Sequence, residues 1–194
     1  MQRKDIIFIT VKTGKVNNIM QALEFQLLYF LQSLHTPWLD RIMTSITLLG
    51  EVGMIWIIIG VLLLCFKKTR RIGICVLSSL VFGTLIGNGI LKNLIARDRP
   101  CWIDPSVKLL IGNQTDYSFP SGHTLASVES AVSIWLYNRR WGTAALILAF
   151  LIGFSRLYLF VHFPSDVVAA AILGVMVAWA VHKAVGAKLE KKGI

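Results

Sequence analysis

The chain has 194 residues, of which 55% are hydrophobic and only 15% are charged, and its mean hydropathy is +0.66. Because soluble domains carry about 25% charged residues, this composition excludes an ordinary soluble protein and predicts an integral membrane protein. The net charge of +10 comes from short Lys/Arg clusters between apolar runs, a pattern that is typical of cytoplasmic membrane loops and does not favour nucleic-acid binding.

The first part of the chain is predicted to hold a tail, an amphipathic helix and a membrane span. Residues 1–18 are polar and basic, and we interpret them as a tail. The helix predicted from Ile19 to His35 is polar on one side, which favours a helix in the membrane interface over a short span shielded by its neighbours. Thr36-Pro37 then interrupts the chain. A helix at the membrane surface over 38–49 leads to a clear span over 52–66.

Four further apolar runs are predicted to cross the membrane. Residues 72–91 form twenty residues without a formal charge, enough to cross a hydrocarbon core of about 30 Å. Within this run, Gly83 and Gly87 have the spacing of small residues that allows close helix packing. The other spans are predicted over 121–137, 141–161 and 167–182. The sequence therefore predicts an all-α, polytopic membrane helix bundle with five transmembrane helices, plus an N-terminal helix that is either amphipathic or a sixth span.

The basic clusters predict how this bundle is oriented. The turns over 67–71 and 138–140 and the C-terminal tail are rich in Lys and Arg, so the positive-inside rule assigns them to the cytoplasmic side. Counting helices from these turns puts the long polar loop over 92–119 and the corner over 156–166 on the outer face. We therefore expect a multi-pass protein of the cell membrane whose ionisable residues gather on the extracytoplasmic side.

The predicted domain organisation is simple. We expect a single membrane-embedded domain over 19–186, between the basic tail over 1–18 and a second basic tail over 187–194. The first tail also prefers the cytoplasmic side, which would require the first helix to span the membrane. Its amphipathic pattern argues against this, so the side of the N-terminus stays open. The three cysteines have no paired spacing, which argues against a disulfide framework or a zinc site.

One stretch between two apolar runs carries ionisable side chains at the edge of the predicted membrane. Arg156, His162 and Asp166 all belong to it. Such residues are costly at that depth and indicate a functional site. His162 and Asp166 are four residues apart, so if the chain turns into the next helix after His162, the Asp166 carboxylate can reach one imidazole nitrogen. That contact would fix the tautomer and leave the other nitrogen free, as a catalytic histidine requires.

Two earlier stretches supply further groups that suit a phosphate. Lys92 and Arg99 add cations on the same predicted face, and Pro120-Ser121-Gly122-His123 opens a predicted helix, where free N–H groups and the helix dipole favour an anion. Phosphoryl transfer needs cations and hydrogen-bond donors around the phosphate oxygens, a nucleophile in line and an acid for the leaving oxygen. His162 is the candidate nucleophile and His123 is the candidate general acid.

The three stretches also occur in a recognisable order. They are Lys92-(six residues)-Arg99-Pro100, then Pro120-Ser121-Gly122-His123, then Ser155-Arg156-(five residues)-His162-(three residues)-Asp166. This order resembles the three-part signature of the type 2 phosphatidic acid phosphatase superfamily, which includes membrane lipid-phosphate phosphatases, glucose-6-phosphatase and soluble vanadium haloperoxidases. The resemblance covers residues 92–166 by motif, and the predicted spans exclude a soluble haloperoxidase-like protein.

The resemblance implies a role for each matching residue. It implies that His162 attacks phosphorus to form a phosphohistidine, that Asp166 stabilises the imidazolium, and that His123 protonates the leaving group. It also implies that the reaction needs no metal and no other cofactor. The residues implied to hold the phosphate are Lys92, Arg99, Ser121, Gly122 and Arg156.

These observations together predict an integral-membrane phosphatase that hydrolyses a lipid phosphate or diphosphate. Undecaprenyl diphosphate is the favoured substrate, with phosphatidylglycerol phosphate or phosphatidic acid next. The polar head would reach the cations while the lipid chains stay between helices. The alternatives are a lipid-linked phosphotransferase and a non-catalytic transporter or scaffold that binds anionic lipid. The expected partners are the lipid substrate and membrane lipids, not nucleic acid, and the sequence does not determine the oligomeric state.

Four other ionisable residues near the predicted site need an interpretation. Arg97 is interpreted as a side chain that reaches to the membrane interface, in preference to one that touches substrate. Asp98 is interpreted as a local salt-bridge partner of Arg99. Glu51 and Glu129 lie in or beside apolar spans, and we favour a hydrogen bond to a neighbouring helix over a role near the phosphate.

Overall fold

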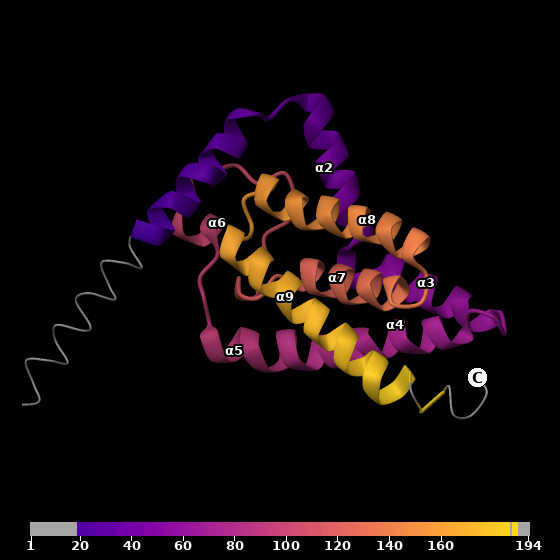
Figure 1. Cartoon of the computed structure of the whole chain (residues 1–194). Helices are drawn as coiled ribbons and strands as arrows, with labels where there is room; N and C mark the ends of the chain where they lie inside the picture. Colours follow the sequence, from indigo (N-terminus) through magenta and orange to yellow (C-terminus); the bar gives the residue numbers. More distant parts are fainter. Residues whose placement is uncertain (1–18, 187, 190–194) are drawn as a thin grey trace, which may run out of the picture.

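The computed structural model describes residues 19–186, 188 and 189, and these form a bundle of helices without a strand (Figure 1). A first helix covers residues 19–33 of the described range. The elements that follow are α2 (Pro37–Leu49), η1 (Glu51–Gly53), α3 (Met54–Cys65), α4 (Arg70–Gly83), η2 (Thr84–Leu91), α5 (Lys92–Ile95), α6 (Pro100–Ile103), α7 (Gly122–Trp135), α8 (Arg139–Tyr158), α9 (Pro164–Val181) and η3 (His182–Gly186). The predicted tail over 1–18 lies outside the described residues, as do residues 187 and 190–194 of the second tail.

Three described helical runs are long and apolar enough to cross a membrane. They are Arg70–Ile103, Arg139–Tyr158 and Pro164–Gly186, and the bent pair Pro37–Leu49 and Glu51–Cys65, with an angle of 43°, would make a fourth span. The prediction of an all-α, multi-pass bundle is therefore confirmed, whereas the number of five or six spans is not. The predicted span over 121–137 corresponds to α7, which has only 14 residues, or about 21 Å of helix.

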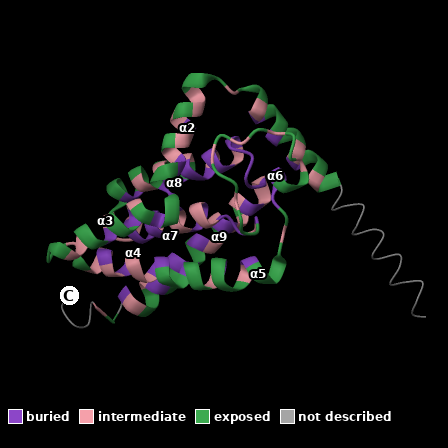
Figure 2. Cartoon of the chain, turned by 180° about the vertical axis from the view of Figure 1, so that it is seen from behind, coloured by how far each residue is buried: buried purple, intermediate pink, exposed green. Residues whose placement is uncertain are grey.

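The short helix α7 lies at the centre of the bundle and packs against α4, α8 and α9. Close packing at Gly83 and Gly87 was predicted and is confirmed. A Cβ atom on Gly83 would lie 1.8 Å from Oε2 of Glu129, and one on Gly87 would lie 2.3 Å from Cδ2 of Leu125. Both partners belong to α7, so these two glycines let α4 and η2 approach it. Buried residues accordingly concentrate along the facing sides of the central helices (Figure 2).

The first helix closes one end of the bundle instead of facing water with its polar side. Phe25 packs against Phe160 and Phe163, with ring centroids 6.1 and 5.3 Å away. Phe160 and Phe163 are fully buried in the corner between α8 and α9. Glu24, on the polar side of the helix, is itself buried with a relative exposure of 7%. The first helix therefore covers the corner that carries His162.

The predicted polar loop over 92–119 is partly helical. The helix that contains α4 continues through the π-helical segment η2 and through α5 before it ends at Ala96, whose φ of 46° is left-handed. After α6, the chain is irregular from Asp104 to Ser121. The prediction of a loop from residue 92 was therefore wrong at its start, because the turn-forming residues lie mainly after Arg97.

All three sequence stretches with ionisable residues meet at one end of the bundle. In Figure 1, α5, α6 and the start of α9 lie at this end, whereas the α3–α4 and α7–α8 turns lie at the other end near the C-terminus. The two basic turns are therefore separated from the ionisable stretches by the length of the helices.

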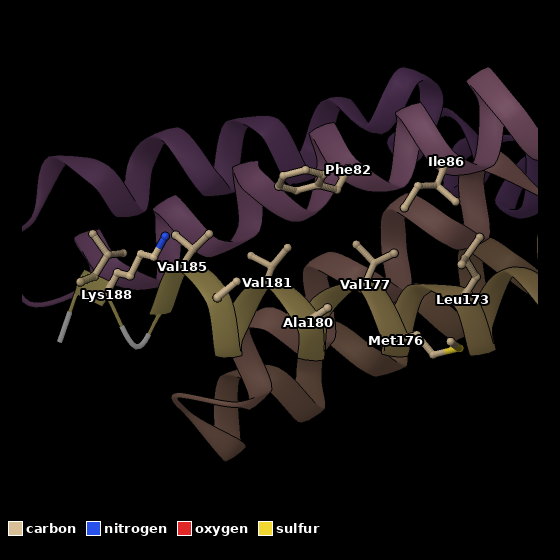
Figure 3. A pocket seen from close by; sticks show the side chains of 11 residues that line it. Phe82, Ile86, Leu173, Met176, Val177, Ala180, Val181, Val185 and Lys188 are labelled. Atoms are coloured by element: carbon tan, nitrogen blue, oxygen red, sulfur yellow. The ribbon is translucent and has the colours of Figure 1, made fainter. Parts of the chain in front are cut away.

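An apolar groove of about 930 Å³ runs between α4–η2 and α9–η3. Figure 3 shows Phe82 and Ile86 lining it from one side and Val177 and Val181 from the other. In a membrane, this surface would be covered by apolar lipid chains. The groove is separate from the polar cavity described next, with which it shares no residue.

Candidate active site

A cavity of about 320 Å³ opens at the end of the bundle where the three stretches meet. Its walls come from η1, α3, α4, η2, α5, α7, α8, the segments before α6 and α7, and the corner after α8. Six of the eight predicted site residues line it, namely Lys92, Arg99, Gly122, His123, Arg156 and His162. Ser121 and Asp166 are not lining residues, but Ser121 directly precedes Gly122 and Asp166 lies 3.8 Å from His162 Nδ1.

Three cations in this cavity are buried, and two of them, Arg99 and Arg156, donate hydrogen bonds to neutral groups. Arg99 Nη1 donates to the Val161 carbonyl over 2.8 Å. Arg156 Nη1 donates to Thr47 Oγ1 over 2.7 Å, and Nη2 donates to Gln114 Oε1 over 3.1 Å. With Lys92, these groups have relative exposures of 7% or less. A buried cluster with this excess of positive charge is suited to an anion with several negative oxygens.

Asp116 supplies the carboxylate that now contacts two of these cations. It pairs with Lys92 and with Arg99, whose Nη2 lies 2.6 Å from Oδ1. Burial alone would raise the pKa of Asp116, but its contacts with Lys92 and Arg99 outweigh burial and lower this pKa to about 2. The expectation that Asp98 pairs with Arg99 is replaced by this longer-range pair: the Arg99 guanidinium donates both to the carboxylate and to the backbone carbonyl of Asp116.

The contacts of His162 determine its tautomer. Its Nε2 lies 3.2 Å from Nη1 of Arg99, and because a guanidinium can only donate, Nε2 is the acceptor. The proton of the neutral ring is therefore on Nδ1, which lies 3.4 Å from Ser118 Oγ. Burial, with the charges of Arg99 and Arg156 in addition, lowers the pKa of His162 to about 3, against the opposing effect of Asp166. The ring is neutral at physiological pH, with a lone pair on Nε2.

Asp166 approaches His162 but contacts it mainly through Ser118. The distance from Asp166 Oδ2 to His162 Nδ1 is 3.8 Å, which is longer than a hydrogen bond. Ser118 Oγ donates to Asp166 Oδ2 over 2.6 Å, so the serine bridges the two groups. The same oxygen of Asp166 accepts from the backbone N–H of Phe163 over 2.8 Å, which caps the start of α9. The spacing of four residues therefore brings the carboxylate near the ring, and Ser118 completes the connection.

A second layer of charge supports Asp166 from behind. Arg97 Nη1 donates to Asp166 Oδ1, and Nη2 donates to Glu24 Oε2, both over 2.6 Å. The guanidinium also lies over the Phe163 ring, 4.0 Å from its centroid. Glu24 in turn accepts from the backbone N–H and the hydroxyl of Ser165 over 2.9 and 2.6 Å. The interpretation of Arg97 as a side chain that only reaches to the interface was therefore wrong, because two buried carboxylates hold it.

Ser121 forms the start of α7. Its side chain is fully buried, and its Oγ accepts from the hydroxyl of Thr124 over 3.0 Å and from its backbone N–H over 3.5 Å. A Cβ atom on Gly122 would lie 3.1 Å from Oδ1 of Asn88, so the backbone at Gly122 passes close to η2. Ser121 thus orients the helix start, where backbone N–H groups can face an anion. A direct contact of its hydroxyl with phosphate stays a prediction.

Comparison with known proteins agrees with this geometry. The model of the PAP2 superfamily matches residues 72–190. The chain belongs to this superfamily. It is 31% identical to phosphatidylglycerophosphatase B of Bacillus subtilis over 186 residues, which are 88% of this chain and 87% of that protein. It is 40% identical to an undecaprenyl-diphosphatase of Sulfolobus acidocaldarius over 122 residues, which are 62% of this chain and only 58% of that protein.

A solved structure of the PAP2 superfamily has the same fold. The crystal structure of a transmembrane PAP2-type phosphatidylglycerolphosphate phosphatase from Bacillus subtilis superposes with a TM-score of 0.72 and 26% sequence identity. The superposition covers 92% of each chain. The helix bundle described above is therefore the PAP2 fold over nearly its whole length.

Two acidic residues of this PAP2 chain, Glu51 and Glu129, line the cavity, which was the less favoured of their two expected places. Glu129 is fully buried at the cavity wall, and neither of its carboxyl oxygens has a hydrogen-bond partner among the described residues. The favoured prediction of a bond to a neighbouring helix was therefore wrong for Glu129. Glu51 lines the cavity too, and its Oε2 lies 3.5 Å from Nε2 of His123. This supports the less favoured expectation of a place near the phosphate site.

Proposed function

We propose that this chain is an integral-membrane phosphatase that removes phosphate from a lipid phosphate or diphosphate through a phosphohistidine intermediate. The observation that carries the proposal is that Lys92, Arg99, His123, Arg156 and His162 line one cavity although they come from separate segments. A neutral imidazole whose Nε2 lone pair points towards the buried cations, where it accepts from Arg99, is an arrangement suited to attack on a phosphate that those cations bind.

In the first step, His162 Nε2 attacks the terminal phosphorus, and the P–O bond to the leaving oxygen breaks; this oxygen belongs to the lipid alcohol in a monophosphate and to the lipid-linked phosphate in a diphosphate. The electron pair of that bond goes to the leaving oxygen, which takes a proton from His123. Lys92, Arg99 and Arg156 neutralise the charge on the non-bridging oxygens in the transition state. The ring of His162 becomes positively charged, and Ser118 and Asp166 stabilise that charge from the Nδ1 side.

In the second step, water attacks the phosphohistidine. His123, now neutral, takes a proton from the water as the oxygen bonds to phosphorus. The N–P bond breaks, and its electron pair returns to His162 Nε2. The cycle ends with inorganic phosphate, a neutral His162 and a protonated His123, so each group recovers the state in which it began.

The walls of the cavity support a lipid as the substrate. Val52 and Ile57, on the side formed by η1 and α3, are 80% and 43% exposed, and Leu80 lies opposite them on α4. An apolar chain can therefore leave the cavity sideways into the membrane while the phosphate stays with the cations. We rank undecaprenyl diphosphate first, and phosphatidylglycerol phosphate or phosphatidic acid next. Relatives named undecaprenyl-diphosphatase and phosphatidylglycerophosphatase support the first two of these substrates.

We also propose that the cavity faces the extracytoplasmic side. The basic turn over 67–71 and the basic turn over 138–140 lie at the far end of the bundle, and the positive-inside rule assigns them to the cytoplasm. A cysteine at Ser106, an exposed position in the loop beside the cavity, tests this in a Cys65→Ser background. We expect a membrane-impermeant maleimide to label it in intact cells, and labelling only after lysis would reverse the orientation.

Phosphate release from the purified protein in detergent tests the activity. Wild type, His162→Ala and the control His182→Ala, which changes a histidine at the far end of α9, are compared on the three lipid phosphates without an acceptor. We expect His162→Ala to lose at least about a thousandfold in turnover and His182→Ala to keep it. Correctly folded wild type that releases no phosphate from any of them would refute the proposal. Turnover only with an added acceptor would instead identify a phosphotransferase.

A further inference from the structure

The kink between α2 and α3 holds one strained residue, Val52, which is followed by a glycine that adopts the same left-handed region without strain. Val52 has a φ of 51° and Gly53 a φ of 68°, both in the left-handed region. A β-branched residue such as valine is a conformational outlier there, at a cost of about 1–3 kcal/mol. The Val52 side chain is 80% exposed, so its own packing does not explain the strain. Strain of this kind is maintained by the surrounding structure and is concentrated at functional sites.

The kink brings one backbone segment and one carboxylate against His123. Gly50 lies against the imidazole, because a Cβ atom there would be 2.9 Å from His123 Cδ2 and 2.8 Å from Ile152 Cγ2. The next residue, Glu51, places Oε2 3.5 Å from His123 Nε2. Nε2 is buried and has no hydrogen-bond partner among the described residues, so this carboxylate is the acid within ion-pair reach of it.

The charges around His123 determine whether its ring can hold the proton that a general acid needs, and the Glu51 carboxylate is one of these charges. The proposed general acid must be protonated when the reaction begins, but cations line the same cavity. Of the other acids that face the cavity, Asp116 is already paired with two cations, and Glu129 lies further along α7. On the remaining side, Asp166 is held by Arg97 and Ser118. The titratable and charged groups that line the cavity with His123 are Glu51, Lys92, Arg99, Asp116, Glu129, Arg156 and His162, and Asp166 lies 3.8 Å from His162 Nδ1.

We propose that Glu51 is a positioning residue that holds the Nε2–H of His123 and so keeps this ring protonated and oriented as the general acid. The inference rests on the phosphatase function proposed above. With Nε2–H held by the carboxylate, the other ring nitrogen, Nδ1, gives its proton to the leaving oxygen as the P–O bond breaks. Nδ1 takes a proton back from the attacking water in the second step. Glu51 itself keeps its charge throughout.

The dependence on the leaving group separates this role from a purely structural one. An alkyl phosphate needs an acid because its leaving oxygen is strongly basic, whereas 4-nitrophenyl phosphate has a weakly basic leaving oxygen and needs little help. For Glu51→Gln, which conserves size, we expect kcat/KM on phosphatidylglycerol phosphate, an alkyl monophosphate, to fall about 10- to 100-fold. On 4-nitrophenyl phosphate we expect a fall of less than about threefold. The alkaline limb of the pH profile for the lipid should also move to lower pH.

Two comparisons keep the test decisive. Asp98→Asn removes an exposed carboxylate from the same end of the bundle, and it should leave kcat/KM unchanged on both substrates. In a His123→Gln background, Glu51→Gln should add no further loss on the lipid phosphate, because the acid it supports is gone. An equal loss on both substrates, or an additive loss in that background, would overturn the inference and leave the phosphatase function standing. Wild type that is inactive on both substrates would refute the function itself.

Discussion

Arg97 offers the most direct test of how the histidine corner is held. Arg97→Ala removes the group that joins Asp166 to Glu24, two carboxylates whose side chains are 0% and 8% exposed. Breaking a buried ion pair by removing one partner costs about 3–5 kcal/mol, because the other charge stays buried. The Arg97 side chain is 26% exposed, so water can replace part of the interaction, and we take the low end, about 3 kcal/mol. This loss is a large fraction of the unfolding free energy of a typical native protein, which is about 5–15 kcal/mol.

The change should also reduce turnover, because Asp166 orients Ser118 and through it His162. We expect kcat to fall about 10- to 100-fold, the range associated with a misplacement of about 1 Å at a reacting group. Denaturant unfolding in detergent, followed by tryptophan fluorescence, measures the first effect, and phosphate release measures the second. Arg97→Lys should be intermediate, because a single ammonium group cannot bridge both carboxylates as the planar fork does.

Arg41→Ala is the matched control, since Arg41 is an exposed arginine on α2. The double variant Arg97→Ala, Glu24→Gln should lose less than the sum of its single variants, because both act on the same pair. The reasoning would be refuted by an Arg97→Ala protein whose unfolding free energy lies within about 0.5 kcal/mol of wild type and whose kcat is unchanged.

Asp116→Asn should lower KM about fivefold, because the carboxylate no longer competes with substrate for the cations. A charged hydrogen bond contributes about 1.5–3 kcal/mol, and we reduce this to about 1 kcal/mol because the Asp116 side chain is half exposed. An unchanged or higher KM in initial-rate assays would contradict this. Since the folded pKa of Asp116 is about 2 and its ordinary value is 3.8, its ion pairs should stabilise the protein at neutral pH and be lost as pH falls from about 4 towards 2. The Asn variant should show a shallower loss of stability over that window in acid titration. Ser118→Ala should lower kcat by about tenfold or more with KM nearly unchanged, because it removes the bridge to Asp166, and equal losses in both constants would refute that role. Gly142→Ala should lower the thermal midpoint without changing kcat, since its Cβ would lie 2.2 Å from the Trp135 backbone, and a midpoint equal to that of wild type would show that the turn can adapt.

Most residues that line the polar cavity and were predicted from sequence belong to short stretches in which the spacing between ionisable residues is fixed. A helix start at Ser121 and a corner after α8 follow from short stretches of sequence, and both occur. The apolar runs likewise predicted the main helices. The apolar runs did not predict the length of each helix. The helix α7 is short and surrounded by longer helices, so the residues at which it begins and ends depend on its neighbours.

The supporting residues could not be predicted, because their partners are distant in sequence. Glu24 lies 73 residues before Arg97, and no local pattern links the two. Glu129 shows a different failure, since a hydrogen bond to a neighbouring helix was expected and none forms among the described residues. Ser127 instead accepts from the Trp56 indole over 2.9 Å, and Gly83, the residue that faces Glu129, has no side chain to offer. A lone acid in an apolar run indicates importance, but only the packing shows what it touches.

The carboxylate of Asp116 changes how occupation of the cavity should be understood. A cluster of bare cations would capture any small anion and release it slowly. Here the half-exposed Asp116 carboxylate pairs with Lys92 and Arg99, and under the proposed function a phosphate would displace it on binding and be displaced by it on leaving. The empty and the phosphate-bound cavity would then differ little in local charge. Such a cavity is suited to releasing product as readily as it binds the next substrate.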